Sequence, residues 1–282
     1  MGFVRKVRIT AVWTTMIILL SGCGTYVPAI HEFWEGTESP ILTAGGALEY
    51  KIKQKVYCGI LEAVAVTREE GLLPRGWAVQ VTLDLQVDES SALNPGISFI
   101  QPLRSSQSFS LGLGGTISSQ GTREDKFGSY WNSDRLKGPS GNPCDPSAQP
   151  EHGSSLLLES DLRITEWLRD ALSSENALPS SAVPKEGDAV FKQGYLSYHV
   201  KFIAISSGNV TPTWKLIRVA TGNGSLPLAS ANRTRTHDLL ITFGPAYKPG
   251  TPNIAINSHA AQELGIAVSN GTRSSIPPFM FP

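Results

Sequence analysis

The chain has 282 residues, with 24 basic and 24 acidic side chains, so its formal net charge is zero. Binding to a nucleic-acid backbone requires clustered positive charge, and no basic run occurs after the first ten residues, so we expect no nucleic-acid partner. Charged residues make up 17% of the chain, and its 27 glycines and 19 prolines favour turns and strands over long helices.

The first residues have the pattern of an export signal. Arg5, Lys6 and Arg8 precede a mostly apolar run over residues 9–20, which the segment Leu20-Ser21-Gly22-Cys23 closes with small residues. A helix that spans a membrane needs about 20 apolar residues. Because this run is only about a dozen residues long, we expect a cleaved signal rather than a spanning anchor.

The segment that ends at Cys23 resembles the lipobox of bacterial lipoproteins. In that family the chain is cut before the cysteine, whose thiol and new amino group are then acylated. The resemblance implies that residues 1–22 are a signal peptide and that Cys23 fastens the protein to a membrane through its acyl chains. Two or more such chains hold a protein stably on a bilayer. An ordinary signal peptidase, which accepts the same small residues, is the alternative.

The resemblance also implies a location. Gly24, rather than an aspartate, follows Cys23 and is similar to the outer-membrane sorting class. We therefore expect a lipid-anchored protein of the bacterial cell envelope, at the outer membrane and facing the periplasm. Removal of residues 1–22 leaves 260 residues with a net charge of −3, which is enough for one large domain or two modest ones.

The chain after Cys23 begins with a tether over residues 23–46, which is rich in proline and glycine and has no sustained period. Alternating apolar and polar residues then predict a strand over residues 48–57. The clearest strand is Trp77–Asp88, where every odd position is apolar. Residues 109–117 and 122–131 indicate a hairpin that turns at residues 118–121.

A long loop follows over residues 132–154, with a short strand at residues 156–158. The period then changes, and apolar residues at three- and four-residue spacing predict an amphipathic helix over residues 161–173. Residues 175–193 have the composition of a linker.

The second half has the same order of elements as the first. Strands are expected over residues 194–206, 214–219 and 234–243, followed by a short helix over residues 258–264 that Gly265 ends. We therefore predict a mainly β or α+β fold, with antiparallel sheets and two short packing helices. Two related modules, residues 47–174 and 194–282, or a single continuous sandwich are both compatible with this pattern.

Two cysteines remain besides Cys23. Cys58 and Cys144 form an even pair in an exported chain, which makes them a candidate disulfide. A buried thiol at Cys58 is the alternative, because that residue lies in an apolar pattern.

The sequence contains few signs of catalysis. It has no G-x-S-x-G elbow, no phosphate-binding P-loop and no H-E-x-x-H motif, so we expect no cofactor and no metal, and we name no catalytic residue. Its five histidines are scattered along the chain. They are His31, His152, His199, His237 and His259.

One polar cluster, over residues 233–238, is a weak candidate for a ligand site. Arg235 and His237 share a face of the expected strand and could meet an anionic group or a carbonyl. His237 and Asp238 are neighbours in that strand and therefore point to opposite faces, which argues against a catalytic pair.

Two classes of function follow from these observations. The first is a non-enzymatic envelope protein that binds another envelope component or has a structural role. The alternative is a periplasmic hydrolase or carbohydrate-active enzyme whose site is assembled from distant residues. A pocket with a Ser/His pair or two carboxylates would favour the enzyme, whereas an exposed apolar patch or sheet edge would favour binding.

Overall fold

The computed structural model describes residues 26–31, 43–102, 108–136, 144, 155–177, 194–211, 219–221, 226–250 and 253–275. The expected signal peptide, Cys23 and all but Val219 of the strand expected over residues 214–219 lie outside these ranges, as do most of the expected linker and most of the long loop.

The predicted fold class is confirmed, because the described part of the chain is rich in strands that form antiparallel sheets, with helices between them. In chain order the elements are α2 (Ala44–Glu69), β1 (Trp77–Leu93), β2 (Gly96–Pro102), β3 (Ser108–Gly114), β4 (Ile117–Asn132), α3 (Leu156–Glu159), α4 (Ile164–Ala177), β5 (Leu196–Val210), β6 (Val219–Thr221), β7 (Ala229–Pro245) and α5 (Ile254–Ser275).

The strands form two sheets. The larger sheet has four strands in the order β4-β1-β7-β5, and the smaller has three in the order β3-β2-β6. In the smaller sheet β2 pairs antiparallel with β3 from Gly96↔Gly114 to Pro102↔Ser108, and β6 pairs with the other edge of β2. The predicted strand over residues 77–88 is confirmed as the first part of β1.

The chain divides into two compact units, each made of separate segments. Unit 1 comprises residues 1–30, 86–124 and 203–236, and unit 2 comprises residues 31–85, 125–202 and 237–282. Each long strand of the larger sheet contributes residues to both units. These boundaries differ from the expected modules 47–174 and 194–282, whose relationship by duplication stays a prediction.

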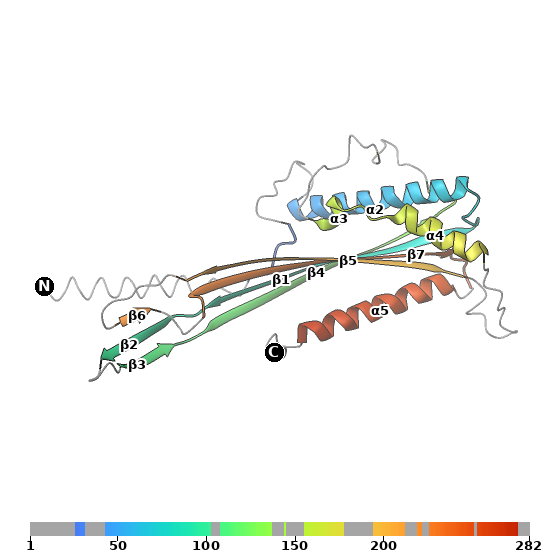
Figure 1. The fold of residues 1–282 in the computed structure, drawn as a ribbon. Helices are drawn as coiled ribbons and strands as arrows, with labels where there is room; N and C mark the ends of the chain where they lie inside the picture. Colours follow the sequence, from blue (N-terminus) through green and yellow to red (C-terminus); the bar gives the residue numbers. More distant parts are fainter. Residues whose placement is uncertain are drawn as a thin grey trace. The chain divides into compact units, whose positions relative to one another are not determined.

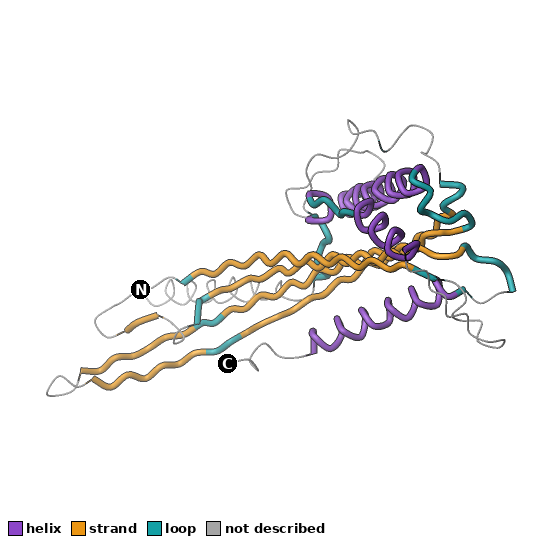
Figure 2. The backbone as a smooth tube through the Cα atoms, turned by 45° about the vertical axis from the view of Figure 1, so that its right-hand side comes forward, coloured by secondary structure: helices purple, strands orange, loops and turns teal. Residues whose placement is uncertain are grey.

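Helices cover both faces of the sheet in unit 2. Figure 1 and Figure 2 show α2, α3 and α4 over one face and α5 along the other. On the first face the Trp167 ring of α4 stacks on the Tyr198 ring, with 4.8 Å between the ring centroids, and its centroid lies 6.1 Å from that of Phe243. On the second face α5 packs so closely that a Cβ on Gly244 would lie 2.5 Å from the Cβ of Ala255. Residues 237–244 of β7 are consequently all buried.

The strand predicted over residues 48–57 is wrong, because these residues belong to the 26-residue helix α2. The buried residues Leu48, Ile52, Val56 and Ile60 recur every four positions, which is the spacing of a helix face. Because four is a multiple of two, apolar residues at this spacing over only ten residues also fit the alternation of a strand. The helix begins at the Thr43 cap, whose hydroxyl accepts a hydrogen bond from the Gly46 amide at 3.2 Å.

The other helices also differ from expectation in their extent. The helix predicted over residues 161–173 is confirmed as α4, displaced by a few residues. Residues 156–158 form the single turn α3 and not a strand. The C-terminal helix α5 has 22 residues and continues past Gly265, because a glycine inside a helix costs only about 1 kcal/mol relative to alanine.

The predicted hairpin of residues 109–117 with residues 122–131 is wrong. Its first strand, β3, pairs instead with β2, a strand that sequence analysis missed, and residues 118–121 lie inside β4. The connection between β3 and β4 is at Gly115, whose amide donates to the Pro95 carbonyl at 3.0 Å. Alternation identified the strands, but it carried no information about which strands pair.

A disulfide joins Cys58 of α2 to Cys144, with their Cα atoms 5.4 Å apart. Both cysteines belong to unit 2 and are separated by 86 positions along the chain, so the bond closes a long loop that includes the unit 1 segment 86–124. In the chain-entropy account such a link stabilises the fold by removing conformational freedom from the unfolded chain.

We predict that Cys58→Ser lowers the free energy of unfolding of unit 2 by up to about 4.5 kcal/mol, the chain-entropy value for a loop of this length. Urea unfolding followed by circular dichroism measures the change. Cys144→Ser is the matched control and should lose the same amount, since either change opens the same loop. Equal stability of both variants and the wild type would contradict the prediction.

His259 of α5 is fully buried between two strands. Its Nε2 lies 2.9 Å from the Thr82 hydroxyl and its Nδ1 lies 2.8 Å from the Thr242 hydroxyl. Burial lowers the pKa of this imidazole, and the nearby Glu263 carboxylate opposes that effect only in part. The neutral ring is therefore the form that the folded protein favours.

This lowered pKa predicts an acid-sensitive contribution to stability. The unfolded imidazole takes up a proton near its ordinary pKa of about 6.5, while the folded one does so only at lower pH. The contribution of His259 is thus fully present above that value and decreases as the pH falls below it. Unfolding measured at pH 7.5 and pH 5 should show a loss in the wild type that is smaller in His259→Gln; an equal loss in both proteins would contradict this assignment.

Candidate binding groove

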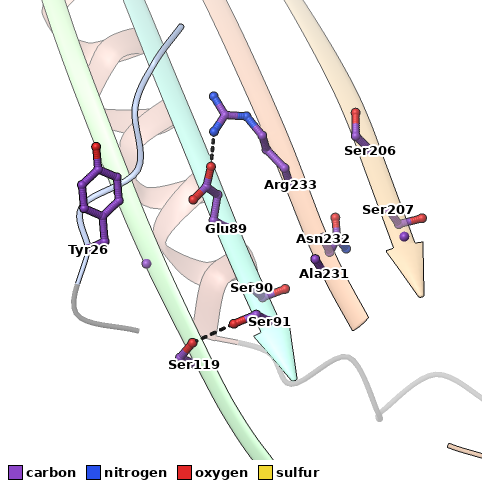
Figure 3. Close-up of a pocket in the computed structure, with 12 residues that line it drawn as sticks. Tyr26, Glu89, Ser90, Ser91, Ser119, Ser206, Ser207, Ala231, Asn232 and Arg233 are labelled. Atoms are coloured by element: carbon purple, nitrogen blue, oxygen red, sulfur yellow. Dashed lines mark hydrogen bonds and ion pairs between the residues drawn. The ribbon is translucent and has the colours of Figure 1, made fainter. Parts of the chain in front are cut away.

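A groove of about 610 Å³ lies across the strands of unit 1 (Figure 3). All four strands of the larger sheet contribute to it, together with the N-terminal segment. Its lining residues are Tyr26, Glu89, Ser90, Ser91, Ser119, Gly121, Ser206, Ser207, Gly208, Ala231, Asn232 and Arg233.

The hydroxyl groups of the groove come from short serine repeats in different strands. Ser90 and Ser91 lie in β1, Ser119 lies in β4, and Ser206 and Ser207 lie in β5. The strands β4 and β1 are neighbours in the sheet, and the Ser91 and Ser119 hydroxyls are 3.0 Å apart, whereas β7 lies between β1 and the serines of β5 (Figure 3). The result is a row of groups that can each donate and accept a hydrogen bond.

An ion pair crosses the groove between Arg233 of β7 and Glu89 of β1 (Figure 3). The same guanidinium donates a hydrogen bond to the Ala29 carbonyl at 2.6 Å. Arg233 is therefore bound to both the sheet and the N-terminal segment. Glu89 balances its charge, and the other polar side chains that line the groove are neutral.

The groove offers hydroxyl groups for hydrogen bonding. A serine hydroxyl needs an adjacent base to become a nucleophile. The residues that line the groove, all in the described part of the chain, include no histidine and no cysteine. Hydroxyl and amide groups in this arrangement suit a neutral ligand with many hydrogen-bonding groups, such as an extended peptide or a glycan.

The two sequence-predicted ligand residues are placed differently. Arg235 is half-buried in the unit 1 part of β7. His237 is only 3% exposed in unit 2, and its Nδ1 lies 2.7 Å from the Ser155 hydroxyl. That hydroxyl also accepts a hydrogen bond from the Leu157 amide at the start of α3. Burial of both partners makes this Ser/His pair part of the core.

Sequence analysis missed a second cluster, which contains Asp238. This carboxylate is 3% exposed, is hydrogen-bonded to the Nε2 of His199 and lies 3.6 Å from the Lys201 ammonium. His199 and Lys201 alternate on β5, so they share a face of that strand. The neighbouring side chains of Asp238 and His237 are expected to point to opposite faces of the strand. They contact different partners, since Asp238 binds His199 and His237 binds Ser155.

The Asp238 cluster borders a pocket of about 450 Å³ whose other wall is α5. The Lys201 ammonium donates to the Asn270 side chain at 2.7 Å, which connects the strand to this helix. A carboxylate beside an imidazole can hold that ring in one orientation for proton transfer. The contacts with His199 and Lys201 also give the buried Asp238 carboxylate its partners, and a buried charge without a partner is costly.

Comparison with known proteins does not assign the chain to a family. No protein-family model and no curated protein matches the chain. Three solved structures of the Salmonella SPI-1 type III secretion injectisome secretin InvG are 9% identical over 72–74% of this chain, and over 71%, 76% and 54% of theirs, with TM-scores of 0.15, 0.13 and 0.13. Values this low carry no argument about fold or function. Among the described helices, none has the length and apolar character needed to cross a membrane.

We predict that Arg233→Met loosens the N-terminal segment. The change removes the hydrogen bond to the Ala29 carbonyl, so amide hydrogen exchange over residues 27–30 should rise several-fold. Glu89→Gln is the matched control, because it removes the ion pair and leaves the Arg233 bond to Ala29 in place. An equal rise in both variants would show that the ion pair, and not this bond, holds the segment.

Proposed function

We propose that this protein is a lipid-anchored, non-enzymatic protein of the bacterial cell envelope that binds another envelope component in the groove of unit 1. The groove is the observation that carries this proposal, because neutral hydrogen-bonding groups from four strands line one open surface. The ligand class that suits it is a neutral polar chain, either a peptide in extended form or a glycan.

Two further observations support an envelope location. The Cys58–Cys144 bond belongs to a class of crosslink that persists in oxidising compartments such as the bacterial periplasm. The groove includes Tyr26, three positions after the expected acylation site at Cys23. An acyl anchor at that position would hold the groove close to the membrane and raise its effective concentration toward a partner there.

A hydrolase is the second candidate, and the Asp238 cluster is the observation that favours it. His199 is 40% exposed at its side chain, so a substrate in the adjoining pocket would have access to the imidazole. In this alternative His199 acts as the general base and Asp238 orients it.

The test is affinity capture of the acylated protein from its own membranes, with variants that separate anchor, groove and cluster. We expect a reproducible partner for the wild type. Asn232→Arg should reduce its recovery at least tenfold, because a long charged side chain would fill the groove. Ser174→Arg, at an exposed position of α4 outside the groove, is the matched control and should leave recovery unchanged.

Two further variants complete the design. Cys23→Ser should release the protein from the membrane fraction, since it removes the acylation site. His199→Gln should leave capture unchanged. Absence of a partner, together with turnover on a panel of glycan and ester substrates that His199→Gln abolishes, would replace the binding proposal with the hydrolase.

A further inference from the structure

The β2–β3 hairpin of unit 1 has one exposed apolar face. Paired residues of antiparallel strands share a face, and the pairs Ile97↔Leu113 and Phe99↔Leu111 therefore lie together, with Phe109 next to them. We call these five residues the hairpin face. Their exposed fractions range from 37% to 59%. The opposite face of the same strands carries serine and glycine at Ser98, Ser110 and Gly112, together with the half-buried Ile100.

An apolar face of this kind is unusual on a protein that meets only water. Contiguous exposed apolar surface marks sites that bind a protein or a membrane. The sequence around it is also almost free of charge, because Arg104 is the one charged residue between Ser90 and Thr122. Charged side chains commonly protect the surfaces of exposed strands from association, and this hairpin lacks them along its described length.

The expected lipid anchor lies in the same unit. Residues 26–28 rest on β4 at Gly121, where a Cβ would lie 3.2 Å from the Tyr26 carbonyl oxygen. Cys23 precedes Tyr26 by three positions, a reach of at most about 11 Å. The strand β4 begins at Ile117, four residues and about 13 Å from Gly121. Ile117 directly follows the hairpin and is itself 53% exposed.

Charge separates this unit from the rest of the chain. The unit 1 segments after residue 22 contain six basic and three acidic side chains, a net charge of +3, whereas unit 2 has a net charge of −6. Positive charge near an anionic bilayer surface is attracted to it. Unit 1 therefore combines positive charge and exposed apolar side chains on the part of the chain that follows the anchor.

We propose that the hairpin face inserts into the interfacial region of an anionic lipid bilayer, next to the acyl chains on Cys23. This inference rests on the anchor of the proposed function and adds a second, non-covalent contact with the membrane. One contact makes the other more favourable, because the anchor keeps the hairpin at the surface. Insertion would also fix how unit 1 is oriented on the membrane.

The test uses the intact acylated protein in vesicles that contain 30% phosphatidylglycerol. Leu111→Cys and Ser110→Cys are neighbouring exposed positions on opposite faces of β3, which makes them a matched pair. Each is labelled with the fluorophore NBD under non-reducing conditions, so that the Cys58–Cys144 bond stays closed. Spin-labelled lipids should quench the label at position 111 at least threefold more than the label at position 110.

The other outcomes overturn the inference. Equal quenching at the two positions, or none, would show that the hairpin face does not select lipid. A label at position 111 that is shielded without vesicles, with crosslinking between copies, would assign the face to a second copy of the chain. Mass spectrometry of the N-terminal peptide shows independently whether Cys23 is acylated. An unacylated Cys23 would therefore refute the anchor, while an acylated protein with a water-exposed label at position 111 would refute only the hairpin contact.

Discussion

The burial of β7 on both faces is the constraint on which the rest of unit 2 depends. Between residues 237 and 244 this strand has α4 against one face and α5 against the other, so each of its side chains needs a partner inside the protein. Apolar residues such as Phe243 pack against Trp167, and polar residues form specific pairs, as Asp238 does with His199. Polar groups at these positions hold layers together, because a buried group without a partner would be costly.

Unit 1 has a different physical character, although the same four strands contribute to it. No helix occurs among its described residues, and its strands carry serine, asparagine and glycine where those of unit 2 carry large apolar side chains. Hydroxyl groups in these positions remain available for a ligand. The proposed binding groove thus lies in unit 1, whereas the buried polar contacts of Asp238 and His259 lie in unit 2.

The proposed membrane contact and the proposed groove occupy different residues of unit 1. The groove contains residues of β1, β4, β5 and β7, while the hairpin face belongs to β2 and β3. A neutral hydrogen-bonding surface suits a polar ligand, and an uncharged apolar surface suits lipid. The two proposals therefore divide the unit by chemistry, and each can fail without the other.

The sequence by itself determined the features that depend on local pattern. Alternation over residues 77–88 identified β1, and the spacing of Ile164, Leu168 and Leu172 identified α4, because a long enough run distinguishes a period of two from one of 3.6. The same reasoning failed at residues 48–57, where both periods fitted. Only the tertiary structure decided that β3 pairs with β2, that Asp238 meets His199, and that serines from separate strands form one groove. These contacts depend on strand order and register, which join residues far apart in the chain and leave no local pattern.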